Sequence, residues 1–224
     1  MIKNISNLGD AALYCDFGNS VSKEINSKVI RYFQSIRNQK IRGIINLTPS
    51  YNKLIISLDL TKTNFNKIKK IIENISLDPI ENLSSKKIEI PVCCNENFSL
   101  DIERLEKKLN LKRNKILDRF FNKEYFCYMT GFIAGMPFLG DLDNDLQAKR
   151  LETPRVKVPK GSVGITEQFA NIYTFESPGG WNIIGNTPIN VFDKSNEINP
   201  NLISPGDSIF FKRIDINQYK NFND

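Results

Sequence analysis

The 224-residue chain contains no histidine. This removes the commonest general base of enzymes and the commonest protein ligand of transition metals. The four cysteines form no Cys-x-x-Cys pair, and no apolar run reaches the roughly 18 residues that cross a membrane. Without a signal peptide, a reduced cytosolic setting is the best interpretation. We therefore expect a cytoplasmic protein with no metal site, stabilised by a hydrophobic core rather than by disulfides.

The chain also lacks a concentrated basic patch, although its formal net charge is +6. Such an excess permits attraction to nucleic acid, anionic lipid or small acidic metabolites. The lysines and arginines are scattered over segments that also carry acidic residues, such as 106–115. That distribution is typical of solvated helix faces. We expect neither nucleic acid nor a membrane as a partner, which leaves a small anionic ligand.

The first half of the chain alternates helical and strand patterns. Apolar residues recur at helical spacing over 22–37 and 64–75, which predicts two helices. Short β-prone runs predict strands over 11–17, 43–48, 52–60 and 87–92. The resulting order, βαββαβ, is the ferredoxin-like plan. We place this N-terminal domain at residues 1–86, with the boundary near 85–92, around the polar stretch 82–87.

The second half, residues 87–224, changes character after two predicted helices at 100–109 and 113–121. From Tyr125 onward, short apolar runs are separated by Gly, Pro, Asp and Ser. Closely spaced short strands with turn signals are typical of a compact β-barrel or a sandwich. The fold class is therefore α+β, with a small mixed domain followed by a β-rich one.

The function is expected in the Gly131–Asp193 stretch, which is dense in Gly, Pro and apolar residues. Its first segment, TGFIAGMPFLGDL (130–142), has three glycines that prevent regular structure and allow close approach of the backbone to another surface. The segment is either a barrel corner or a loop that lines a pocket with Phe132 and Phe138. Composition alone does not decide between the two.

Two further segments carry candidate binding groups. Pro178-Gly179-Gly180 forms a sharp turn whose free amides suit a carboxylate or phosphate. The single tryptophan, Trp181, follows as either a core anchor or a stacking platform. Arg155, in a proline-braced basic loop, suits bidentate binding of a carboxylate; the alternative is a solvated loop. No nucleophile is assigned, because Cys127 lies in a predicted strand and is expected to be buried.

Taken together, these segments resemble the allophanate hydrolase subunit 1 family, which is also known as the Kip-inhibitor family or the family of 5-oxoprolinase B subunits (carboxyltransferase domain, subdomains C and D). The family motifs are a GFxPGFxYLGxL loop, a TPR…VPxGSVxI segment and IY…SPGGWxxIGxTPxxxFD. The similarity extends to 9–13, 43–59 and 91–105, and so covers most of the chain. The positions kept in the three motifs include Gly131, Phe132, Gly135, Leu139, Gly140, Leu142, Arg155, Pro159, Gly161, Ser162, Tyr173, Pro178, Gly179, Gly180, Trp181, Gly185, Phe192 and Asp193.

The resemblance implies a ferredoxin-like N-terminal domain and a cyclophilin-like β-barrel. It also implies a cytosolic protein that works with a second, related protein, the C subunit or allophanate hydrolase subunit 2. In the bacterial enzyme, the B, C and A subunits together open the lactam of 5-oxoproline to glutamate, and the assembled complex uses ATP. Two alternatives within the family are an inhibitor of a sensor histidine kinase and a component of allophanate breakdown.

The resemblance also assigns candidate site residues and shows where this chain departs from the motifs. The expected lining consists of Gly131, Phe132, Gly135, Phe138, Arg155, Ser162 as a hydrogen-bond donor, Tyr173, Pro178, Gly179, Gly180 and Trp181. Several polar or charged groups of the family are replaced. Departures stand at Ala134, Met136, Lys149, Leu151, Phe169 (for Gln), Asn171 (for Gly) and Asn186 (for Arg), and at Phe120, near the place of a histidine.

Overall fold

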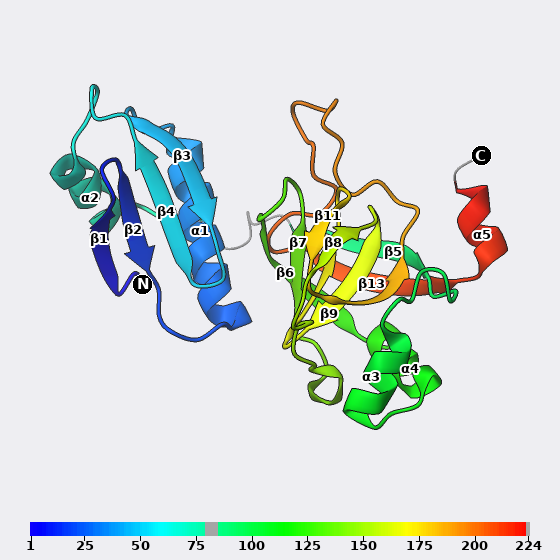
Figure 1. Cartoon of the computed structure of the whole chain (residues 1–224). Coiled ribbons are helices and arrows are strands. Elements are labelled where there is room, and N and C mark those ends of the chain that lie inside the picture. The colour runs from blue at the N-terminus through cyan, green and yellow to red at the C-terminus, as the bar shows by residue number, and fades with distance from the viewer. Residues whose placement is uncertain (79–84, 223–224) are drawn as a thin grey trace. The chain divides into compact units, whose positions relative to one another are not determined.

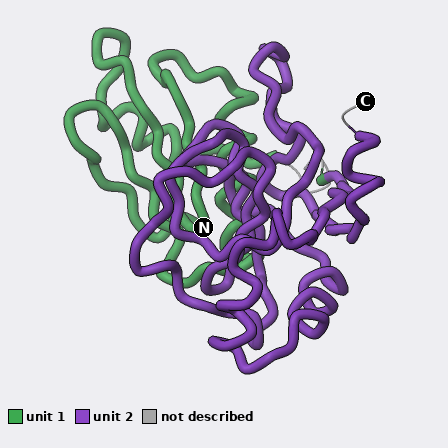
Figure 2. Tube along the Cα trace, turned by 45° about the vertical axis from the view of Figure 1, so that its right-hand side comes forward, with its two compact units in different colours: residues 1–85 green, residues 86–224 purple. Residues whose placement is uncertain are grey.

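The computed structural model describes residues 1–78 and 85–222. The chain divides into two compact units, residues 1–85 and residues 86–224 (Figures 1 and 2). Half of the polar stretch 82–87, where we expect the boundary, lies outside the described residues. Each unit has its own buried apolar cluster, as separate domains do.

Unit 1 is a four-stranded antiparallel sheet accompanied by two helices, with strand order β1-β2-β4-β3. Both predicted helices form, and their apolar stripes are buried. Ser22 caps the first helix by accepting a hydrogen bond from the Ile25 backbone N–H at 3.3 Å, and Asn64 caps the second. The elements are β1 (Asn4–Leu8), β2 (Ala12–Asp16), α1 (Lys23–Gln39), β3 (Ile44–Pro49), β4 (Lys53–Leu58) and α2 (Phe65–Glu73).

The expected ferredoxin-like order is wrong, because unit 1 runs ββαββα. The polar segment Asn4–Leu8 adds an edge strand, β1, in which only Ile5 is buried. The strand expected over 87–92 exists as β5 (Lys87–Cys93), but it belongs to the sheet of unit 2. The reason lies in its packing, since Ile90 and Val92 are fully buried in the core of that unit.

Unit 2 contains a closed barrel in the order β10-β7-β6-β13-β5-β12-β9, which confirms the barrel alternative. Its β13 runs parallel to β5, whereas the other neighbouring strands are antiparallel. A separate two-stranded sheet consists of β8 (Arg155–Val158) and β11 (Ser177–Gly179). The remaining barrel strands are β6 (Glu124–Thr130), β7 (Pro137–Gly140), β9 (Ser162–Thr166), β10 (Phe169–Ile172), β12 (Asn182–Asn186) and β13 (Ser208–Ile214).

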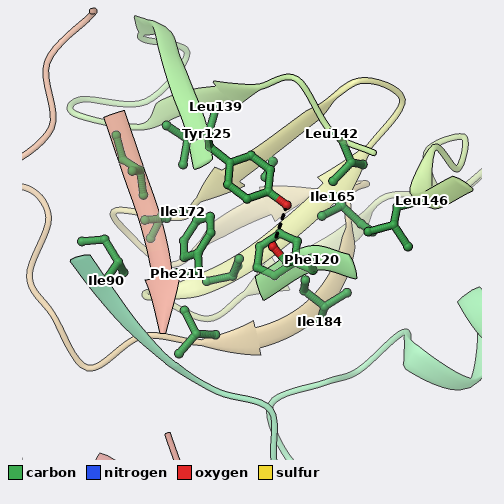
Figure 3. Close-up of a cluster of buried hydrophobic side chains, with 14 of the residues drawn as sticks. Ile90, Phe120, Tyr125, Leu139, Leu142, Leu146, Ile165, Ile172, Ile184 and Phe211 are labelled. Carbon is green, nitrogen blue, oxygen red and sulfur yellow. Dashed lines mark hydrogen bonds between the residues drawn. The ribbon is translucent and has the colours of Figure 1, made fainter. Parts of the chain in front are cut away.

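Three aromatic side chains, Phe120, Tyr125 and Phe211, pack among aliphatic side chains in the core of unit 2 (Figure 3). The rings of Phe120 and Phe211 stack with centroids 4.8 Å apart. The hydroxyl of Tyr125 donates a hydrogen bond to the Phe120 carbonyl at 3.0 Å, so its polar atom is satisfied inside the core. Phe120 comes from α4 (Arg113–Phe121), which follows α3 (Ile102–Leu109) as predicted. The interior of the barrel therefore serves stability, and binding chemistry has to use other surfaces.

Candidate functional site

The strands of the Gly131–Asp193 segment bury side chains on both of their faces. Along β10, Ala170 and Ile172 point into the barrel core. Successive residues of a strand alternate between faces, and Tyr173 accordingly belongs to a second cluster. We call this the outer-face cluster, and it collects residues from all three predicted segments. Its buried members are Met136, Val158, Tyr173, Trp181 and Ile183, with Ile133, Phe138 and Phe169 packed against them.

Tyr173 occupies the centre of the outer-face cluster and is only 1% exposed. Its hydroxyl lies directly against Gly179, where an added Cβ would be 2.0 Å from the phenolic oxygen. Only glycine leaves room for the tyrosine at this place, which gives the Gly-Gly turn a steric explanation. The predicted Tyr173 and Gly179 are therefore brought into direct contact.

The surroundings of the Tyr173 hydroxyl are polar and cationic. Burial raises the pKa of this phenol above its ordinary value. Hydrogen bonding to the Asn171 side chain and to the Trp181 backbone N–H acts in the opposite direction, as do the charges of Arg150 and Arg155. Because burial outweighs them, Tyr173 stays neutral near pH 7 and keeps its proton as a hydrogen-bond donor.

Arg155 is held in place by an ion pair with Asp101. One guanidinium nitrogen, Nη2, lies 2.6 Å from Asp101 Oδ1. The other carboxylate oxygen accepts a hydrogen bond from the Ile183 backbone N–H at 2.6 Å. Asp101 is only 4% exposed, so this is a mostly buried, charge-assisted contact. Arg155 Nη1 is buried and has no hydrogen-bond partner in the described part of the chain, which leaves a cationic donor at the site.

Asp101 is a site residue that the sequence analysis missed. It lies 54 positions before Arg155, and no motif connects the two. The only local signal was its position directly before α3, where an aspartate is typical of a helix N-cap. In the structure, however, the Asp101 side chain makes no capping bond to that helix. It turns instead to Arg155 and Ile183, which the sequence pattern does not indicate.

The first glycine loop is fastened to the other segments. The Thr174 hydroxyl donates to the Ala134 carbonyl at 2.8 Å. Gly135 has a φ of +71° and lies so close to Phe192 that an added Cβ would be 2.4 Å from its ring. Phe132 also has a positive φ, +68°, and is 81% exposed. The loop thus holds an aromatic side chain in solvent on a rigid support.

The remaining predicted residues take different positions. Phe138 and Trp181 pack edge to face with ring centroids 5.7 Å apart, so both anchor the cluster. The Gly131 N–H closes the first loop on the Met136 carbonyl at 3.0 Å. Ser162 is buried in β9, where its carbonyl accepts from the Tyr173 backbone N–H. Pro178 is exposed, and Gly180 is buried beside Arg150.

Other titratable groups of the chain offer little chemistry. All four cysteines are buried and unpaired, and burial raises the pKa of Cys127 well above its usual range. Lys157 pairs with Glu176 at 3.0 Å on the surface, as the solvated-loop interpretation expects. Within the described ranges, no three His, Cys, Asp or Glu residues gather as a metal site would require. No helix there has the length and apolarity needed to cross a membrane.

The positions that depart from the family motifs do not form one group. Phe120 is in the barrel core, so the absent histidine is not a gap in the outer-face cluster. Asn186 accepts a hydrogen bond from the Tyr219 hydroxyl at 2.7 Å, which attaches α5 (Ile216–Asn221) to the barrel. Phe169 and Asn171, by contrast, lie at the outer-face cluster. Met136, another departure, is a buried member of the same cluster, so the altered lining extends over β10 and the loop directly before β7.

Comparisons with known proteins agree with this architecture. A family model described as "Carboxyltransferase domain, subdomain C and D" matches residues 3–203. The B subunit of 5-oxoprolinase from Bacillus subtilis (strain 168) is 32% identical over 227 residues, covering 96% of this chain and 94% of that protein. The B subunit of 5-oxoprolinase from Haemophilus influenzae is 30% identical over 209 residues, covering 93% and 96% respectively.

A solved structure contains a region of similar fold within a longer polypeptide. TTHA0988 matches with a TM-score of 0.82 at 26% sequence identity, over 91% of this chain. This chain spans only 40% of that one. The family model and the two full-length relatives together extend over both units. The chain therefore belongs to the carboxyltransferase-domain family of subdomains C and D, together with the 5-oxoprolinase B subunits.

Proposed function

We propose that this chain is the B subunit of a 5-oxoprolinase-type amidohydrolase, which opens 5-oxoproline to glutamate with ATP hydrolysis. The observation that carries the proposal is the 32% identity to the B subunit of a 5-oxoprolinase, which covers nearly the full length of both proteins. The match therefore runs through both units and is not confined to one of them. Fold alone would not support this conclusion, because one fold hosts many functions.

The chemistry of the outer-face cluster suits the binding of this substrate. 5-Oxoproline carries one carboxylate and one lactam, a stabilised amide whose carbonyl gains negative charge when water adds. Arg155 Nη1 is a free cationic donor for the carboxylate. Tyr173 is a neutral donor beside two arginines, which favours an oxygen that becomes negative. The proposal assigns binding and charge stabilisation to this chain, and no nucleophile.

The proposal includes a partner that is homologous to the C subunit, with the A subunit completing the enzyme. The relatives are named as the B subunit of 5-oxoprolinase, which implies an assembly of several chains. In TTHA0988 the matching region is part of a polypeptide more than twice as long, as a fused partner would produce. Phe132 is a suitable contact residue, because an exposed aromatic on a braced loop loses little entropy on binding.

Co-expression with homologues of the C and A subunits tests the proposal. The purified complex is expected to release glutamate from 5-oxoproline only when ATP is present, and the chain alone is not. A well-folded, stoichiometric complex without this activity would overturn the proposal. Inhibition of autophosphorylation of a sensor histidine kinase by the chain alone would then support the regulatory alternative.

A further inference from the structure

Three buried polar atoms without partners belong to residues on strands that carry the outer-face cluster or pair with such a strand. In the described part of the chain, Arg155 Nη1, Asn171 Oδ1 and Ser177 Oγ are buried and make no hydrogen bond. Ser177 pairs with Val158, a member of the cluster, in the β8–β11 sheet. Folded proteins satisfy nearly all such atoms, because an unpaired one costs free energy. Two of them belong to Asn171 and Arg155, which both interact with the Tyr173 hydroxyl, and this indicates a place where a polar ligand supplies the missing partners.

Asn171 is the least expected of these residues. It lies in the middle of β10, opposite Gly164 of β9 and Phe138 of β7, and it is fully buried. Its side chain lies over Gly164, where an added Cβ would be 2.8 Å from Oδ1. The amide nitrogen donates to the Met136 sulfur at 4.0 Å, and the Asn171 side chain forms a hydrogen bond with the Tyr173 hydroxyl. The amide oxygen, Oδ1, is buried and has no hydrogen-bond partner in the described residues, so it is an unused acceptor.

Asn171, which has the unused acceptor, and Arg155, which has the unused cationic donor, both interact with Tyr173. They come from two different sheets, the barrel and the β8–β11 sheet. Asn171 belongs to β10 of the barrel wall, and Tyr173 directly follows the end of that strand. Arg155 belongs to the β8–β11 sheet, where it pairs with Gly179. Gly179 is the residue against which the Tyr173 hydroxyl lies. A small ligand beside that hydroxyl would therefore meet an acceptor on one side and a guanidinium on the other.

We propose that Asn171 is a specificity-determining residue that accepts a hydrogen bond from the ring N–H of a cyclic amide acid. In this arrangement the lactam N–H donates to Asn171 Oδ1, and the neighbouring carboxylate accepts from Arg155 Nη1. The inference rests on the proposed function, and it identifies the ring N–H as the substrate group that Asn171 recognises. 5-Oxoproline has the required N–H and carboxylate on adjacent ring atoms. The family motif has glycine at this position, so the selection is a property of this chain.

A carbocyclic analogue in which CH₂ replaces the ring N–H, an oxocyclopentane carboxylate, tests the assignment in the assembled complex. A site that hydrogen-bonds a substrate N–H discriminates against a ligand that lacks it, because the buried acceptor is then left unpaired. We expect 5-oxoproline to bind at least about 10-fold more tightly than the analogue. Asn171→Leu, which keeps the approximate volume without an acceptor, is expected to reduce the ratio to within about threefold.

Two further variants make the measurement decisive. Asn171→Gly introduces the residue of the family motif, so it provides a second loss of the acceptor if the leucine variant does not fold. Asn201→Leu is the matched control, because Asn201 Oδ1 is also a buried atom without a partner but lies outside the cluster. This control is expected to retain the wild-type ratio of affinities.

The possible results separate the inference from the proposed function. If the wild-type complex hydrolyses 5-oxoproline and the folded Asn171 variants keep the wild-type ratio, the role of Asn171 is wrong and the proposed function stands. If the variants lose the discrimination and the Asn201 variant does not, the role is supported. If a folded wild-type complex neither binds nor hydrolyses 5-oxoproline, the proposed function and the inference both fail.

Discussion

Replacement of Gly179 by alanine is a minimal change whose effect follows from the geometry. The new Cβ would lie 2.0 Å from the Tyr173 hydroxyl oxygen and 2.7 and 2.8 Å from two ring carbons. These separations are far below van der Waals contact, and Tyr173 is buried, so its ring has little room to move. Overpacking of this kind costs about 1–3 kcal/mol. We expect the free energy of unfolding to fall by that amount.

The adjacent glycine provides the matched control. An alanine Cβ at Gly180 would meet nothing closer than 3.5 Å, the distance to Arg150 Nε, which is ordinary contact. Gly-to-Ala changes at positions without strain stabilise proteins by about 0.4–1 kcal/mol, because the unfolded chain loses freedom. The same substitution at these two neighbouring positions is therefore expected to change the free energy of unfolding in opposite directions.

Urea unfolding followed by the fluorescence of Trp181 measures both effects. This is the only tryptophan of the chain and belongs to the outer-face cluster, so its signal reports on the region that is changed. Tyr173→Phe in the Gly179→Ala background removes the 2.0 Å contact but leaves the two ring carbons, so only partial recovery is expected. If Gly179→Ala and Gly180→Ala agree within about 0.5 kcal/mol, the steric reasoning is refuted.

Two other changes address charge and pH. Arg155→Ala leaves the buried Asp101 carboxylate without its cation, so we expect about 1–3 kcal/mol less stability, and a smaller loss in an Asp101→Asn background. Additive losses in this double-mutant cycle would contradict the ion-pair assignment. Burial raises the pKa of Cys94 from 9.0 to about 12, so the native state keeps a proton that the unfolded state releases. Its contribution to stability is present below pH 9 and is lost as the pH rises toward 12, by up to about 1.4 kcal/mol per pH unit. The fall in the free energy of unfolding with rising pH, measured by urea unfolding and Trp181 fluorescence, should be shallower in Cys94→Ala than in the wild type. Equal slopes in the two proteins would refute the assignment of this fall to Cys94.

Much of the fold follows from local patterns. The helices α1 and α2 form where their apolar stripes predict them, because the 3.6-residue period is a strong local signal. The strand β1 was not predicted, because this edge strand buries only Ile5 and therefore shows no apolar alternation. The strand β5 was predicted but placed in the wrong unit. Its partner, β13, is distant in sequence, and strand pairing over such distances leaves no local trace.

The site was predictable to the extent that it depends on glycine. The Gly-Gly turn and the proline-braced arginine indicated the segments that form the outer-face cluster. The ion pair of Arg155 with Asp101 was not predictable, because only the closed barrel brings α3 beside β12 and the β8–β11 sheet. The buried position of Asn171 was also not evident, because an asparagine between apolar neighbours is equally typical of a turn.

The parallel pairing of β5 with β13 also determines when the second unit acquires its shape during synthesis. The Lys86 N–H donates to Asp207 Oδ1 at this junction, across a sequence separation of 121 residues. A ribosome adding roughly 5–20 residues per second takes on the order of ten seconds to cover that distance. During this interval β5 has emerged with an open edge and an apolar face, a state prone to misassociation. The barrel closes only when β13 arrives, so the interval in which β5 is open to misassociation lasts through the synthesis of nearly all of the second unit.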